Sequence, residues 1–150
     1  QRNGLRIDPE LDMARAYEMI STFLEKKSYR RPVHTLDELQ LLARRFPDQI
    51  HVSGVFKEDS LLHSTISFHS ESCIRVQYTG GSSQGQELYA LDFFCGSLCQ
   101  DPKNQGRWID FGTSMDLATG ELDPELHWYK ESFGGRSSLV RTFVLNLREA

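Results

Sequence analysis

Two short segments in the second half of the chain carry side chains that could do acid–base chemistry. The first, WIDFGTS, holds Asp110 and Ser114 among large apolar residues, and the second, WYKESFGGR, holds Tyr129 and Lys130. A carboxylate, a phenol and an amine are groups that orient a polar substrate or exchange protons with it. Asp110, Ser114, Lys130 and Arg136 are too polar for their aromatic surroundings unless something holds them there. We therefore expect the functional site to include these two segments.

A third segment combines glycines with small and amide side chains. It reads TGGSSQGQ from Thr79 to Gln86, between an expected strand and an expected helix. Backbone N–H groups that point one way at a helix N-terminus bind phosphate. The residues expected to form such a cradle are Gly80, Gly81, Ser82, Ser83, Gln84, Gly85 and Gln86. Ser83 is expected to cap the helix, with Gln86 completing a capping box. The alternative is a structural turn, because no Arg or Lys lies between Arg75 and Lys103.

The histidines and cysteines give weaker signals. His51, His63 and His69 fall on neighbouring expected strands, and the last two share one strand face, so they could converge. No acid is well placed among them, and surface or turn histidines fit the pattern better than a metal site. The chain has three cysteines, an odd number that does not suggest a disulfide framework. We expect reduced thiols packed in the core, no bound metal and a cytoplasmic protein.

Length and composition indicate one ordinary globular domain. The 150 residues suffice for a single hydrophobic core, and 39% of them are apolar. A formal net charge of -4, with scattered basic residues, argues against a non-specific nucleic-acid binder. No apolar run approaches the roughly 20 residues that a membrane span needs. The chain begins at Gln1 rather than Met, so residues 1–150 are either one whole domain or a fragment of a longer, two-domain protein.

The elements that must position these side chains can be predicted from periodicity, caps and breakers. In order, we expect a helix over 11–27, a helix from the capping box Thr35–Glu38 to Phe46, strands over 50–56, 61–68 and 73–78, a helix over 87–99, a strand around Asp110, a helix over 124–133 and a strand over 139–147. Short polar turns between β-prone runs are typical of an antiparallel meander. A strand–helix–strand unit after it should add a parallel pair. The sequence therefore predicts an α+β fold with a mixed, mainly antiparallel sheet flanked by helices.

Five short motifs recur in an order known for one family of folds. They are PVH (32–34), VQY (76–78), ALD (90–92), DFGTS (110–114) and KESFG (130–134). With the glycine-bearing segment between the third meander strand and its helix, the chain resembles the GNAT acyltransferase fold. More narrowly, it resembles the GNAT-like domains of the FemAB-type family, whose bacterial members are often labelled acetyltransferases. The resemblance extends over most of the chain, from the first helix to the last strand.

The resemblance implies an N-acyltransferase that moves an acyl group, acetyl before others, from an acyl-CoA to an amine of a small molecule, a sugar or a cell-envelope precursor. It places the phosphates of acetyl-CoA at the segment Gly80–Gln86. Asp110 would orient the acceptor amine or take its proton. Tyr129 would protonate the departing thiolate, which suits a phenol with a pKa of about 10, and Lys130 would be the motif member beside it. The residues implied to lie against the substrate are His34, Gln77 and Ser114.

Three alternatives stay open. Asp110 and Lys130 could form a buried ion pair that holds strand to helix instead of doing chemistry. The lack of a basic residue in the Gly80–Gln86 segment is compatible with a non-catalytic GNAT-like recognition or pairing domain. The chain could also be one half of a FemAB-type aminoacyl transferase, which pairs two such domains. Its acidity weighs against that third reading, because an RNA-binding surface should be basic.

Overall fold

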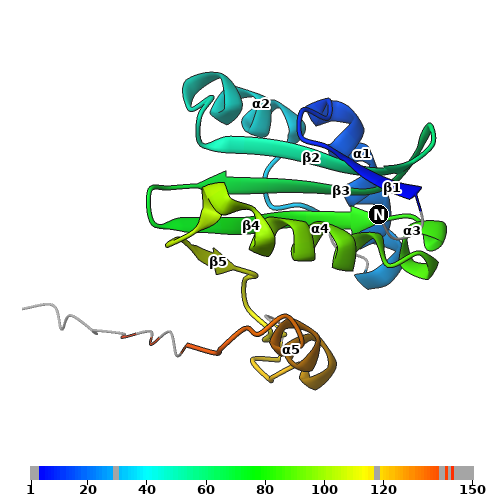
Figure 1. Ribbon diagram of the computed structural model, residues 1–150. Coiled ribbons are helices and arrows are strands. Elements are labelled where there is room, and N and C mark those ends of the chain that lie inside the picture. The colour runs from blue at the N-terminus through cyan, green and yellow to red at the C-terminus, as the bar shows by residue number, and fades with distance from the viewer. Residues whose placement is uncertain (1–3, 29–30, 117–118, 139–140, 142, 144–150) are drawn as a thin grey trace, which may run out of the picture. The chain divides into compact units, whose positions relative to one another are not determined.

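The computed structural model describes residues 4–28, 31–116, 119–138, 141 and 143. Contacts within the chain group it into two compact units, Gln1–Thr113 and Ser114–Ala150, and each unit is described by itself (Figure 1). The expectation of one domain over residues 1–150 stays a prediction. Within the described residues, no helix has the length and apolar character required to cross a membrane.

The first unit is built on a five-stranded sheet. Its strands are β1 (Leu5–Asp8), β2 (Ile50–Lys57), β3 (Ser60–His69), β4 (Cys73–Gly81) and β5 (Trp108–Asp110). They lie in the order β1-β2-β3-β4-β5, with antiparallel pairs from β1 to β4 and a parallel pair between β4 and β5. Short turns suffice for antiparallel neighbours, whereas the parallel pair needs a longer crossover, here through helices. The predicted mixed, mainly antiparallel sheet is confirmed.

The first strand was not among the predicted elements. β1 has only four residues, and its alternation is too short to stand out before the helix that follows. It pairs along the outer edge of β2, where Leu5 becomes buried. At the other end of the chain, the predicted strand over 139–147 lies almost wholly outside the described residues.

Helices cover both faces of the sheet. α1 (Met13–Ser28) and α2 (Leu36–Arg45) pack on one face, and α3 (Ser83–Glu87) and α4 (Ala90–Gln100) connect β4 to β5 on the other (Figure 1). The capping box predicted for the second helix is present. Thr35 Oγ1 accepts from the Glu38 backbone N–H at 3.3 Å, and the Glu38 carboxylate accepts from the Thr35 backbone N–H at 2.7 Å.

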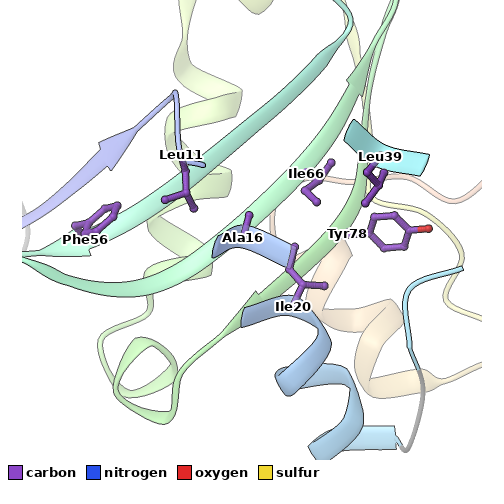
Figure 2. Packing of buried hydrophobic residues seen from close by; sticks show 7 residues of the cluster. All are labelled: Leu11, Ala16, Ile20, Leu39, Phe56, Ile66 and Tyr78. Carbon is purple, nitrogen blue, oxygen red and sulfur yellow. The ribbon is translucent and has the colours of Figure 1, made fainter. Parts of the chain in front are cut away.

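The main core lies between the sheet and the first two helices. Figure 2 shows seven of its residues, which are Leu11, Ala16, Ile20, Leu39, Phe56, Ile66 and Tyr78. Apolar residues recur at helical spacing in α1 and at alternate positions in the strands, so each element presents one apolar face to the other. This packing fixes the position of β4 relative to α1.

On the opposite face of the sheet, β3 carries polar side chains that are buried. His63, Thr65 and Ser67 alternate along β3, and each is at most 5% exposed. His63 Nε2 lies 3.2 Å from Thr65 Oγ1 and 2.7 Å from Thr79 Oγ1, and its ring centroid is 6.4 Å from that of Phe94 in α4. Burial lowers the pKa of His63 to about 4, so the imidazole is neutral at pH 7.

The second unit contains α5 (Pro124–Glu131). The helix begins as predicted, because Asp123 accepts from the Leu126 backbone N–H at 2.9 Å and Pro124 takes the first helical position. Before it, Met115 and Leu122 form an isolated antiparallel bridge.

We predict that His63 makes the protein less stable as the pH falls from about 6.5 to about 4. In this window the unfolded chain binds a proton at this histidine and the folded chain does not, so the free energy of unfolding rises with pH. The loss from this residue by pH 4 is on the order of 2–3 kcal/mol. Urea unfolding over this pH range measures the stability, and the His63→Asn variant should show a shallower dependence. An NMR titration that gives His63 a pKa near its ordinary value would contradict the prediction.

Candidate active site

β4 and β5 run side by side only where they begin. Cys73, Ile74 and Arg75 pair with Trp108, Ile109 and Asp110. β4 then continues to Gly81, whereas β5 ends and the chain turns at Gly112, which has a φ of 76°. In the part of the chain that the structure describes, β3 is the only strand beside the rest of β4. From Val76 onward, the open edge of β4 presents backbone N–H and C=O groups that an extended ligand can hydrogen-bond.

The strand carries an extra residue at this edge. Val76 pairs with Ser67, and Tyr78 pairs with the adjoining Ile66, so Gln77 forms a β-bulge. A bulge bends its strand and re-aims the backbone, and bulges are frequent beside active sites. The predicted substrate-binding residue Gln77 thus lies just beyond the point where β4 and β5 separate.

The glycines of the TGGSSQGQ segment permit close backbone packing. A Cβ atom on Gly80 would lie 2.7 Å from the Cα of Ile20 in α1, and one on Gly81 would lie 3.0 Å from the backbone oxygen of Leu62 in β3. A Cβ atom on Gly85 would collide with that same oxygen. Close backbone packing therefore explains the presence of glycine at all three positions without any ligand.

Ser82, and not Ser83, caps the helix that follows β4. Its Oγ accepts from the Gly85 backbone N–H at 3.0 Å, and its own N–H donates to a carbonyl of β3 at 2.9 Å. The predicted capping box with Gln86 is wrong, because the position three residues after the cap is Gly85, which has no side chain. Ser83 and Gln84 form the exposed first turn of α3.

The helix predicted over 87–99 corresponds to α4, which begins three residues later than predicted, and the separate short helix α3 precedes it where a loop was predicted. α3 ends at Glu87 and α4 begins at Ala90, with Tyr89 between them in the left-handed conformation at a φ of 55°. A tyrosine in this conformation is strained and depends on its surroundings to hold it. No local pattern indicates the break, because Leu88 and Leu91 continue the helical spacing of apolar residues.

His34 fastens the connector between α1 and α2 to β4. Its Nδ1 lies 2.6 Å from the Tyr78 hydroxyl oxygen, and its backbone N–H donates to the same oxygen at 3.3 Å. The Tyr17 hydroxyl donates to the backbone oxygen of His34 at 3.2 Å. The His34 ring meets the Phe68 ring edge-on, with 6.2 Å between centroids. His34 thus holds the connector on the α1–α2 face of the sheet, and its contact with a substrate stays a prediction.

Asp110 is paired with Arg75, its direct neighbour on β4. The Arg75 guanidinium donates to one carboxylate oxygen, and the Gly112 backbone N–H donates to the other at 2.7 Å. The two charged side chains are 42% and 43% exposed, so the ion pair contributes at most about 1 kcal/mol. Arg75 lies opposite Phe68 in the register, which puts this pair on the same sheet face as His34.

Three of the predicted site residues belong to the second unit. Tyr129 and Lys130 lie in α5, where the Tyr129 ring packs edge-on against Phe133 with 5.2 Å between centroids. The backbone oxygen of Ser114 accepts from the residue that caps α5 at 2.8 Å. The catalytic and substrate roles of these residues, and the ion pair between Lys130 and Asp110, stay predictions.

Sequence analysis missed Arg75 and Tyr78. Their partners lie 35 and 44 positions away along the chain, so no local pattern marks them. One signal was usable for Arg75, which is the basic residue of a strand expected to run parallel to that of Asp110. Tyr78 looked like an ordinary core residue, and it is one, apart from its hydroxyl group.

The strand histidines converge in part. The ring centroids of His51 and His69 lie 4.0 Å apart, whereas His63 is hydrogen-bonded to Thr65 of β3 and Thr79 of β4. Within the described ranges, no group of three or more His, Cys, Asp or Glu side chains is placed to hold a metal ion. The cysteines are free thiols, and burial raises the pKa of Cys95 to about 12.

Comparison with known proteins identifies the fold. No protein-family model and no curated protein matches the sequence. Among solved structures, a protein of the GNAT family from Xanthomonas campestris matches with a TM-score of 0.64 and 13% identity over 96% of both chains. An aminoglycoside N-acetyltransferase in complex with CoA matches with a TM-score of 0.52 and 9% identity over 97% of this chain and 98% of that one. A glucosamine-6-phosphate N-acetyltransferase from Arabidopsis thaliana matches with a TM-score of 0.53 and 10% identity over 94% of this chain and 97% of that one. The chain therefore has the GNAT acetyltransferase fold.

We predict that Gly85→Ala lowers the free energy of unfolding by about 3 kcal/mol, because its Cβ has no room beside the Leu62 oxygen. The matched control is Gly96→Ala in α4, where a Cβ meets nothing within 4 Å. This control should stabilise the protein by about 0.5–1 kcal/mol, since alanine is the better helix former. Urea unfolding of both variants makes the comparison. A Gly85→Ala protein as stable as the wild type would show that packing does not require this glycine.

Proposed function

We propose that this protein is an N-acyltransferase that moves an acyl group, acetyl before others, from an acyl-CoA to an amine. The observation that carries the proposal is the separation of β5 from β4 after Arg75, together with the bulge at Gln77. The open edge of β4 can hydrogen-bond the amide groups in the pantetheine arm of CoA, much as a strand edge takes up an extended peptide. The fold shared with a CoA-bound acetyltransferase supports this proposal.

The pyrophosphate of CoA suits the first turn of α3. The backbone N–H groups of Ser83 and Gln84 are not used within the helix, and both residues are exposed. Because this segment lacks Lys and Arg, anion binding would depend on these backbone groups. In this proposal the roles divide: Gly80, Gly81 and Gly85 set the position of the turn by close packing, and the residues from Ser82 to Gln86 meet the phosphates.

The proposed reaction is direct transfer. The amine nitrogen attacks the thioester carbonyl carbon, a C–N bond forms, and the C–S bond breaks with its electron pair going to sulfur. Asp110 orients the amine and accepts its proton, and Tyr129 gives its phenolic proton to the thiolate, with Lys130 beside it. Most of the rate enhancement would come from holding the two substrates in line.

The proposed acceptor is an amine of a small molecule or sugar. It would lie on the α1–α2 face of the sheet near His34 and Gln77, with Ser114 as a further contact. Acetyltransferases of the same fold include those named for aminoglycosides and for glucosamine 6-phosphate, which is the same chemical class of acceptor. A cell-envelope precursor, a cytoplasmic location and a bacterial, FemAB-type relationship are parts of this proposal.

A second candidate function is a non-catalytic recognition or pairing domain. The observation in its favour is that packing alone accounts for Gly80, Gly81 and Gly85, while the segment carries no basic side chain. Such a domain could be one half of a FemAB-type aminoacyl transferase. It would keep the fold without binding an acyl donor by itself.

We predict that acetyl-CoA at about 100 times its Kd raises the melting temperature by about 5–10 °C. Ser83→Glu should abolish most of this shift, because a carboxylate at the first turn of α3 would repel the pyrophosphate. The same change should not harm the free protein, since an acid is favourable at a helix N-terminus. The matched control is Ser83→Gln, because glutamine has the size of glutamate but no charge. This variant should keep the shift in melting temperature.

Differential scanning fluorimetry and calorimetry with acetyl-CoA measure both effects. Absence of any shift in the wild type would reject the acyl-CoA proposal and favour the non-catalytic domain. An equal shift in wild type and Ser83→Glu would instead show that the donor binds elsewhere.

We further predict that Asp110→Asn lowers kcat by about 100-fold with an amine that the wild type acetylates, because it removes the group that accepts the proton. Arg75→Gln is the control, since it breaks the same ion pair and leaves the carboxylate in place. It should lower kcat less than about 5-fold, and both variants should lose at most about 1 kcal/mol of stability. Release of free CoA thiol measures the rate. Equal losses of activity in the two variants would assign Asp110 a structural role.

A further inference from the structure

A cavity lies on the α4 face of the sheet, at the end of β4 remote from Gly81. Its volume is about 730 Å³. The beginning of β2 and the end of β3 contribute to its lining, together with α4 and the short helical turn η2 (Pro102–Asn104). The proposed donor site is at the other end of β4, beside Ser82. The cavity therefore requires its own explanation, and that explanation does not depend on acyl transfer.

Two stacked histidines line this cavity. The rings of His51 and His69 lie 4.0 Å apart with an interplanar angle of 31°. His51 Nε2 is 3.1 Å from the backbone oxygen of Asp48, and His69 Nε2 is 2.9 Å from Ser67 Oγ. Burial, then the nearby His51 and Arg107, lower the pKa of His69 to about 4. At neutral pH the His69 side chain is uncharged and can form a hydrogen bond with a ligand.

Arg107 supplies a permanent positive charge beside the histidines. One guanidinium nitrogen donates to the backbone oxygen of Ser70. The Nε atom is buried and has no hydrogen-bond partner among the described residues. The Arg107 side chain also lines the cavity, where its guanidinium group can form a charge-assisted bond with a carboxylate oxygen of a ligand. Arg107 therefore points to a ligand that carries a negatively charged oxygen.

The rest of the lining limits what that ligand can be. Asp48, Glu71 and Asp101 are exposed carboxylates along the cavity, against one further cation, Lys103. Three acids would repel a polyanion such as a nucleotide, but they suit a ligand that also carries an ammonium group. The apolar side chains of Phe94 and Leu98 in α4 complete the wall.

We propose that this cavity binds a free α-amino acid with an apolar side chain. The carboxylate meets Arg107 and His69, and the ammonium group faces the acids of the lining. The side chain packs on Phe94 and Leu98. Neither charged end alone matches the lining, because a simple amine leaves Arg107 without an acceptor and a simple carboxylate meets three acids.

Three probes of the same carbon skeleton test the proposal on the full chain. They are L-leucine, 4-methylpentanoate, which lacks the ammonium group, and 3-methylbutylamine, which lacks the carboxylate. L-Leucine should shift the ring signals of His51 and His69 in NMR titrations with a Kd of about 1 mM or below. Each of the other two should bind at least about 10-fold more weakly, since each loses a charge-assisted contact. No shift of these signals with L-leucine at 20 times that concentration, or equal affinity for 4-methylpentanoate, would overturn the proposal.

Variants separate the two ends of the ligand. Arg107→Gln should weaken the binding of L-leucine at least about 10-fold. The matched control is Arg45→Gln, at an exposed position in α2, which should leave the affinity for L-leucine unchanged. Because Arg107→Gln also alters a backbone contact, Glu71→Gln on an exposed turn provides the second test. This variant should bind L-leucine about 3-fold more weakly than the wild type. It should bind 4-methylpentanoate at least as tightly as the wild type, because the Glu71 carboxylate repels that probe. Wild-type affinity in both lining variants would show that the amino acid binds elsewhere and would overturn the assignment.

Discussion

The close backbone contact that the end of β4 makes with α1 and β3 is the constraint on which the rest of the structure depends. Gly80 brings β4 against the backbone of α1, Gly81 brings it against β3, and Gly85 brings the next helix onto the same carbonyl of Leu62. A single methyl group at any of these positions meets backbone rather than a movable side chain. The contacts with α1 and β3 therefore fix the position of β4. They also fix the position of its open edge, which lies beyond the point where β5 ends.

The two faces of the sheet have different chemistry because they are packed by different helices. The α1–α2 face is apolar over most of its area, and the Asp110–Arg75 pair and the His34–Tyr78 contact lie on it near the point where β5 leaves β4. The α4 face carries a row of histidines and hydroxyl groups along β3, which is buried under α4 at one end and lines a cavity at the other. One fold thus carries two separate clusters of polar side chains, one on each face of the sheet.

The sequence predicted those features that local patterns encode, and it failed where distant segments decide the outcome. Thr35 and Glu38 lie within one turn, so their capping box could be predicted, and short polar turns revealed the meander. The pairing of Asp110 with Arg75 joins two strands, and the cap residue Ser82 is held by the Leu62 carbonyl of β3. No spacing of residues marks the break at Tyr89. The glycine segment is the most instructive case. It was predicted to be a loop, but Thr79–Gly81 belong to β4 and α3 begins at Ser83. Three of its glycines are explained by packing against Ile20 and Leu62, which no spacing rule could show.

The central claim is that the edge of β4 and the first turn of α3 form one binding surface for an acyl donor. Mapping of backbone amide NMR shifts with CoA tests it most directly. The account predicts that the amides from Gln77 to Gln84 change most, while the ring signals of His51 and His69 in the separate cavity stay unchanged. Saturable binding with its largest shifts elsewhere, or no binding at millimolar CoA, would contradict it.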